Sequence, residues 1–268
     1  MPLDPALVTE LRNILRSFGA AHSPASIPNG GGKALEAWLL MKLAFEAQRS
    51  GSWHVELCNG AGHPLGAGAS FKSRGGPGKM PALNHAASGF IRLSPNWIPH
   101  PYFTLELHGS LQWLGRSGAK HECDVSVLPS VVGEAIRHYG GGYPQGLPIV
   151  SLECKDKSGP GQLDEMRECL ARMFDLAYVC QTPLGGYNRI FHAPTYTYWG
   201  KRSSMYRSYY NNSLFAIVRV GTFQTGAQQL SGHYSISQYP DIYSPHGTSV
   251  DRMVTKFLNV INSIQSLG

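Results

Sequence analysis

Four stretches of the chain space their apolar residues as an α-helix does when it packs one side against a core. They are Pro5–Phe18, Lys33–Gln48, Gly161–Leu176 and, near the end of the chain, Val250–Ser266. The first ends at Gly19, a common helix stop signal. The second is apolar on nearly every side and carries Glu36 in its first turn, so it predicts a deeply packed helix with an acid at its amino end.

In shorter stretches apolar and polar residues alternate, or apolar residues follow one another, as they do in β-strands. We expect strands at Trp53–Leu57, Tyr102–Trp113, His121–Leu128, the segment that begins at Pro148, and Tyr178–Gln181. The turn Gly115–Gly118 separates the second and third strands, which predicts an antiparallel hairpin. A short helix is expected at Val131–Tyr139.

This order of helix, hairpin, strand, helix and strand predicts an α/β sandwich with a mixed central sheet flanked by helices. We expect an N-terminal helix and linker over residues 1–32 and a core over residues 33–181. Residues 182–268 are rich in aromatic residues and are expected to form a C-terminal extension packed on that core.

Composition narrows the class of protein. The chain has 268 residues, 42% of them hydrophobic and only 15% charged, which favours a folded, soluble protein over a disordered one. Charged residues interrupt its longest apolar run, so we expect no membrane span and no secretion. Five cysteines lie far apart, which suits a reducing compartment such as the cytoplasm. The net charge of +6 favours a polyanionic partner only weakly.

Charged residues stand where two of the expected strands should be apolar. After Pro148 the strand ends in Glu153, Cys154 and Lys155, and alternation places the acid and the lysine on one face. In the preceding strand Glu122 and Asp124 share a face. If the two strands are neighbours, the carboxylates of Asp124 and Glu153 form a site for a hard divalent cation such as Mg²⁺, with the positive charge of Lys155 beside it.

The ordered set Asp124, Glu153, Cys154 and Lys155, in the wording HECDVSVL followed by IVSLECKDK, resembles the PD-(D/E)XK, or restriction-endonuclease-like, nuclease superfamily. The resemblance covers roughly residues 33–181 and implies a restriction-endonuclease-like sandwich. It implies that Asp124, Glu153 and the Cys154 carbonyl bind metal and that Lys155 positions the attacking water. It also implies an upstream helical acid, matched by Glu36, and a polar residue that opens the following helix, matched by Gln162. Cys123 stands where the family usually has proline.

Three alternatives concern the same strands. An acid and a lysine at a strand end often form a surface ion pair with no catalytic role. Cys154 could be a thiol nucleophile, but alternation turns its side chain into the core, where cysteines are normally inert. His121 could be a further metal ligand, although alternation places it on the face away from Asp124.

Two basic segments are candidates for binding nucleic acid. Thr195–Asn212 mixes tyrosines and a tryptophan with Lys201, Arg202 and Arg207, so its rings could stack on bases while its cations contact phosphates. The same aromatic residues could equally fill strand pairs or an interface. The loop Lys72–Lys79 contributes Lys72, Arg74 and Lys79, and a simple solvated loop is its other interpretation.

The sequence therefore predicts a Mg²⁺-dependent endonuclease that hydrolyses DNA phosphodiester bonds, with Mn²⁺ able to replace Mg²⁺. RNA stays open as a substrate, and the resemblance suggests restriction or anti-phage defence. We expect a homo-oligomer, and a partner protein that activates it or confers specificity. The alternative is a nuclease-fold protein that has lost catalysis and serves as a nucleic-acid-binding or assembly subunit.

Overall fold

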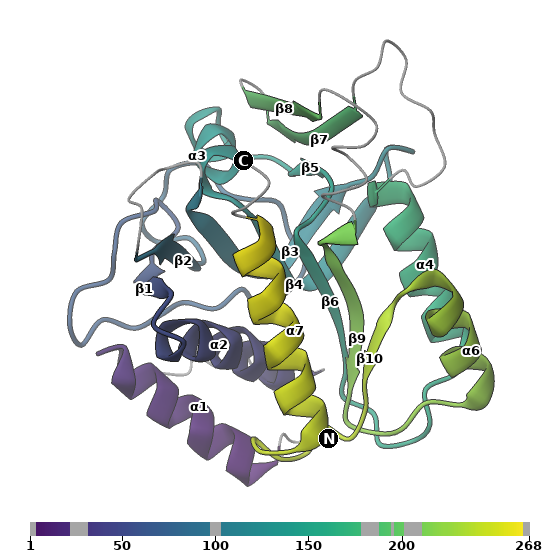
Figure 1. Ribbon diagram of the computed structural model, residues 1–268. Helices are drawn as coiled ribbons and strands as arrows, with labels where there is room; N and C mark the ends of the chain where they lie inside the picture. Colours follow the sequence, from purple (N-terminus) through teal and green to yellow (C-terminus); the bar gives the residue numbers. More distant parts are fainter. Residues whose placement is uncertain are drawn as a thin grey trace.

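The computed structural model describes residues 4–21, 32–96, 103–177, 188–193, 196–200 and 211–264, with backbone alone for 188–193 and 196–200. Within these ranges ten strands form one open, mixed β-sheet with helices on both sides. Figure 1 shows α1, α2 and α7 on one side of the central strands and α4 and α6 on the other. The α/β class and the mixed sheet expected from the sequence are confirmed.

The described helices match those expected from the sequence, except for α6, which was not expected. They are α1 (Pro5–Ser17), α2 (Lys33–Arg49), α3 (Ser130–His138), α4 (Leu163–Ala177), α6 (Thr225–Tyr234) and α7 (Thr248–Ile264). Helix α1 begins where Asp4 accepts a hydrogen bond from the backbone N–H of Ala6 at 2.8 Å, an N-cap followed by proline. No helix in the described ranges has the length and apolar character needed to cross a membrane.

The strands occur in an order that puts the hairpin at the centre. They are β1 (Trp53–Cys58), β2 (Phe90–Pro95), β3 (Leu105–Leu114), β4 (Lys120–Pro129), β5 (Gln145–Gly146), β6 (Val150–Lys155), β7 (Asn188–Ala193), β8 (Tyr196–Gly200), β9 (Leu214–Arg219) and β10 (Ser237–Tyr239). Neighbours run β1-β2-β3-β4-β6-β9-β10, and β5, β7 and β8 continue from the far end of β3. Strands β6, β9 and β10 are parallel to one another. Strand β4 is antiparallel to both of its neighbours, β3 and β6.

Strand β4 lies in the middle of the sheet. It was expected to have one apolar face and one acidic face, but most of both faces is buried. From Cys123 to Pro129 every residue is buried, including Ser126, whose hydroxyl accepts a hydrogen bond from the indole N–H of Trp113 at 3.1 Å. Helices cover both faces of a central strand, so polar residues on either face are buried and need internal partners. Only the first residues of β4, including Glu122, retain solvent exposure.

Three segments differ from the expectation or lie outside it. The region 58–101, expected as a long loop, contains β2, which pairs with β1 and β3. Strand β9 was not predicted, because its residues are buried on both faces and do not alternate. It pairs directly with β6, so the segment after residue 182 contributes strands to the same sheet. The strand expected at Tyr178–Gln181 lies outside the described residues.

Candidate functional site

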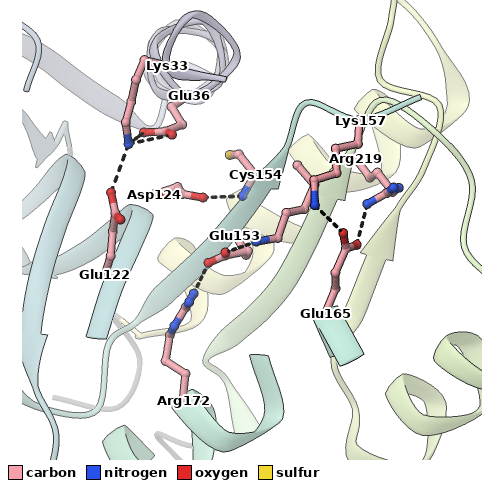
Figure 2. Close-up of polar contacts among 11 residues, drawn as sticks. Lys33, Glu36, Glu122, Asp124, Glu153, Cys154, Lys157, Glu165, Arg172 and Arg219 are labelled. Carbon is pink, nitrogen blue, oxygen red and sulfur yellow. Dashed lines mark hydrogen bonds and ion pairs between the residues drawn. The ribbon is translucent and has the colours of Figure 1, made fainter. Parts of the chain in front are cut away.

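The site lies where β4 and β6 stop pairing. Their ladder runs from Val127 opposite Val150 to Val125 opposite Leu152 and ends there. The next residue of β4 is Asp124, and its Oδ2 accepts a hydrogen bond from the backbone N–H of Cys154 at 2.6 Å. The side chain therefore takes the place of a strand carbonyl and is fixed by the backbone of β6 (Figure 2).

Three carboxylates converge beside this point. Glu36 comes from the first turn of α2, and Glu122 and Asp124 come from β4. One oxygen from each lies within 4.8 Å of the others. We refer to Glu36, Glu122 and Asp124 as the carboxylate cluster. Glu36 and Asp124 are both buried, so their charges are not screened by water and need partners inside the protein.

Ser110 holds the helical member of the cluster in place. Its hydroxyl donates a hydrogen bond to Oε2 of Glu36 at 2.7 Å. Ser110 lies in β3 between the paired residues Gly109 and Leu111, and its φ of 47° is in the left-handed region that most residues avoid. A buried serine in this conformation indicates that the surrounding structure stabilises local strain at the site.

Lys33 supplies the positive charge of the cluster. Its Nζ lies 2.9 Å from both carboxylate oxygens of Glu36 and 3.0 Å from Oε1 of Glu122. Burial lowers the pKa of Lys33, but the two carboxylates more than offset this and raise it. Burial raises the pKa of Glu36, and hydrogen bonds from Lys33 and Ser110 reverse only part of that shift.

The charge of Asp124 is compensated less, since the hydrogen bond that its Oδ2 accepts comes from the neutral backbone N–H of Cys154. Burial raises the pKa of Asp124 to about 8, and the negative charges of Glu153 and Glu36 add to the shift. The arrangement thus holds one buried acid that is protonated at neutral pH unless a cation arrives. Such a group, shifted by burial and like charges, is typical of functional sites.

Glu153 is turned to other partners. Its Oε1 accepts a hydrogen bond from Nζ of Lys155 at 2.7 Å, and its Oε2 is paired with Arg172 of α4. Figure 2 shows Glu153 reaching toward Arg172, on the side of β6 away from Glu36. Burial raises the pKa of Glu153, but Arg172 and Lys155 outweigh it and lower the pKa, so the carboxylate is ionised.

The donor set of the carboxylate cluster fits Mg²⁺ or Mn²⁺. Hard divalent cations prefer a small number of carboxylate oxygens, and here three side chains from two elements offer them within reach of one ion. This set shares Asp124 with the ligands that the sequence implied but adds Glu36 and Glu122. Both oxygens of Glu153 are instead held by cations.

Cys154 and Glu153 lie on opposite sides of β6, and Cys154 packs against the core, both as alternation predicts. The carboxylate cluster, however, lies on the Cys154 side of β6 and not on the Glu153 side as expected. Figure 2 shows the sulfur of Cys154 turned toward Glu36 rather than away from the acids. The reason is that α2 covers the apolar side of the sheet and brings Glu36 with it. Burial raises the pKa of the Cys154 thiol well above its ordinary value, and Asp124 and Glu36 add to the shift, which makes the thiol a poor nucleophile.

Other predicted site residues lie apart from the cluster. Gln162 is exposed just before α4. His121 faces Asp175, with Nε2 and Oδ2 2.6 Å apart, and this contact accounts for its position without a metal.

The expected basic residues fall into two groups. Lys72 and Lys79 are exposed on the loop between β1 and β2, and Nζ of Lys72 donates to the carbonyl oxygen of Ala86 at 2.6 Å. Arg74 is half-buried and donates to the carbonyl oxygen of Lys79 at 2.9 Å, so it organises the loop. Lys201, Arg202 and Arg207 lie outside the described residues.

Sequence reasoning missed four members of the site: Lys33, Ser110, Glu122 and Arg172. Glu122 was recognisable, because it shares the strand and the alternation of Asp124. Lys33 and Arg172 are cations on helices, where such residues usually face solvent. The sequence offers no local signal that either one is buried against an acid.

The geometry therefore comprises a buried carboxylate cluster with a bound lysine and, across the end of β6, a glutamate held by two cations. Comparison of the chain with family models, with curated proteins and with solved structures finds no match.

Proposed function

We propose that the chain is a metal-dependent endonuclease of the PD-(D/E)XK type that hydrolyses DNA phosphodiester bonds. The observation that carries the proposal is the convergence of Glu36, Glu122 and Asp124 beside the strand end that bears Lys155. The order of Glu36, Asp124, Glu153 and Lys155 along the chain and the mixed central sheet also support the proposal. Restriction or anti-phage defence is the biological role that this resemblance suggests.

Mg²⁺ or Mn²⁺, when bound, would supply a Lewis acid that offsets charge on the phosphate and acidifies a water molecule. Glu36, Glu122 and Asp124 would hold it. Lys155 keeps its proton, since burial lowers its pKa but the facing Glu153 carboxylate more than offsets this and raises it. The residue therefore acts as a hydrogen-bond donor that orients water or phosphate, and it does not act as a general base.

Glu153 and Arg172 are positioning residues in this scheme. Glu153 fixes the ammonium group of Lys155 through a 2.7 Å hydrogen bond, and Arg172 fixes Glu153 from α4. The side chains of Glu153 and Arg172 are largely buried. The linked side chains of Arg172, Glu153 and Lys155 are therefore held in one arrangement, as preorganised catalysis requires.

A phosphate backbone is the expected ligand near the site. The net charge of +6 and the exposed Lys72 and Lys79 support binding to a polyanion, and such contacts weaken as salt rises. Lysine side chains of this kind contact phosphates and do not read bases, so we propose that sequence specificity is low or depends on a partner protein. We also propose that the working form is a homo-oligomer.

The direct test is to incubate the purified protein with supercoiled plasmid and Mg²⁺. We expect nicked and linear products that EDTA abolishes and Mn²⁺ restores. A parallel reaction with RNA separates a deoxyribonuclease from a ribonuclease. Plasmid and RNA that stay intact at every Mg²⁺ and Mn²⁺ concentration would reject the proposal.

One observation favours a second function, that of a catalytically silent nucleic-acid-binding or assembly subunit. Glu36 and Glu122 are already compensated by Lys33, and Glu153 is compensated by Lys155 and Arg172. A site neutralised from within can be purely structural. In that case the protein would shift labelled duplex DNA in a gel without metal and would leave the DNA uncut when Mg²⁺ is added.

A further inference from the structure

The side chain of Lys33 is held as a bound ion would be. Four side-chain oxygen atoms surround Nζ: both carboxylate oxygens of Glu36 at 2.9 Å, Oε1 of Glu122 at 3.0 Å and the hydroxyl of Ser110 at 3.2 Å. An ammonium group has only three N–H donors, so four oxygens within this range coordinate its charge as much as they accept discrete hydrogen bonds. These oxygens come from three separate elements: α2, β3 and β4.

Lys33 therefore shares its carboxylates with any metal ion at the site. Two of the three acids of the carboxylate cluster, Glu36 and Glu122, contact Nζ directly. A divalent cation bound by the same oxygens would lie within a few ångströms of the ammonium group. At such a separation the repulsion amounts to several kcal/mol at the effective dielectric of a protein surface, so the two cations exclude each other.

We propose that Lys33 is the resident cation of the carboxylate cluster and that a divalent metal ion binds there by displacing it from Glu36 and Glu122. The inference rests on the metal site of the proposed function and concerns how that site is filled. Lys33 stabilises the fold while metal is absent, and it weakens metal binding, because part of the binding energy is used to remove it.

The position of Lys33 allows this exchange. It is the first residue of α2, and its flexible four-carbon side chain is 16% exposed, so the amine has a route to solvent. Glu122 is 28% exposed and provides the open side through which a hydrated ion reaches the cluster. The residue before it, Gly32, has a φ of +82°, a conformation that glycine adopts without strain.

The first test compares wild-type protein with Lys33→Met, which keeps an unbranched side chain of similar length and removes its charge. We expect Mn²⁺ titrated in a calorimeter to bind Lys33→Met at least about tenfold more tightly, given the size of the repulsion removed. We expect the metal-free variant to melt at a lower temperature and to recover when Mn²⁺ is added. Lys157→Met is the matched control, because Lys157 is an exposed lysine paired with Glu165 outside the cluster, and it should change neither quantity.

A second measurement keeps the inference testable if Lys33→Met does not fold. In wild-type protein, Mn²⁺ should release the amine of Lys33 and increase its labelling by an amine-reactive reagent severalfold, as read by mass spectrometry. Labelling of Lys157 should stay constant. Unchanged labelling of Lys33 at Mn²⁺ concentrations that saturate the protein, or equal or weaker Mn²⁺ affinity in folded Lys33→Met, overturns the inference.

These measurements report metal occupancy, so they fail separately from the proposed function. Tighter Mn²⁺ binding by Lys33→Met without plasmid cleavage by either protein would support the exchange and reject the nuclease. Cleavage of plasmid by both proteins with equal Mn²⁺ affinity would support the nuclease and reject the exchange. No Mn²⁺ binding by either protein rejects both.

Discussion

Oδ2 of Asp124 lies 2.6 Å from the backbone nitrogen of Cys154, across the point where β4 and β6 cease to pair. The hydrogen bond satisfies an N–H that the parting strands would otherwise leave without a strand partner, and it fixes the carboxylate beside Glu36 and Glu122. A carboxylate accepts several hydrogen bonds or ligands, so this contact leaves capacity for a cation. The end of one strand pairing thus positions the acid on which the proposed chemistry depends.

The raised pKa of Asp124 predicts how stability depends on pH. The side chain titrates at about 8 in the folded protein, against an ordinary value of 3.8. Between these values the folded state binds more protons than the unfolded state, so the free energy of unfolding falls as pH rises. Relative to Asp124→Asn, wild-type protein should lose up to about 1.4 kcal/mol per pH unit in this window.

Urea unfolding of both proteins at pH 5, 6, 7 and 8 measures this difference. Most other titrating groups are common to the two proteins, so their contributions largely cancel. Curves that run parallel across the window would show that Asp124 titrates normally. Added Mg²⁺ should flatten the slope of the wild-type curve, because it favours the ionised carboxylate.

Glu153→Gln should destabilise the protein, because it leaves two largely buried cations, Lys155 and Arg172, without their shared carboxylate. Loss of one partner from a buried ion pair costs about 3–5 kcal/mol. The double variant Glu153→Gln with Arg172→Met should recover part of this loss, and Glu168→Gln, an exposed change on α4, should be neutral. Thermal melts of these variants decide the matter. A melting temperature for Glu153→Gln equal to that of wild type would argue against the pairing.

Lys155→Ala should reduce cleavage without preventing metal binding. Removal of one preorganised hydrogen-bond donor typically costs about 10²-fold in rate. Lys157→Ala, two residues along the chain and paired with Glu165 at the surface, serves as control. Initial rates of plasmid nicking, with Mn²⁺ affinity measured alongside, test the assignment. Equal rates in the two variants would remove Lys155 from the mechanism.

A buried ion pair that does not belong to the cluster predicts a stability effect of its own. Glu106 is fully buried and receives two hydrogen bonds from Arg137, at 2.5 and 2.8 Å. Glu106→Gln should cost about 3–5 kcal/mol by leaving Arg137 uncompensated. Glu134 is exposed on α3, the helix that carries Arg137, and Glu134→Gln should change stability little. Mn²⁺ affinity should be unaffected by either change, and a large loss of affinity in Glu106→Gln would link this pair to the metal site.

Much of the fold could be predicted because its elements have strong periodicity. Helix α2 was expected at Lys33–Gln48 and spans Lys33–Arg49, and the hairpin of β3 and β4 forms around the expected turn. Strand β9 could not be predicted from alternation, since a strand covered on both faces has a plain apolar run as its sequence. Its pairing with β6 depends on contacts far apart in sequence, which no local pattern encodes.

The candidate site was predicted only in part, for a similar reason. Alternation identified Asp124, and the family resemblance implied the helical acid that Glu36 matches. Which acid a buried cation would neutralise depends on tertiary packing, and Lys33 and Arg172 therefore escaped notice. Alternation also could not tell which side of the sheet α2 would cover, which is why the acidic site was expected on the side of β6 away from Cys154.

The most direct test of the central claim is plasmid nicking across a Mg²⁺ titration by wild type, Asp124→Asn and Asp164→Asn. The last is the matched control, because Asp164 is an exposed aspartate on α4 paired with Arg167. We predict Mg²⁺-dependent nicking by wild type and Asp164→Asn, and a loss of about 10²-fold or more in folded Asp124→Asn. Nicking by Asp124→Asn at the wild-type rate would contradict the account.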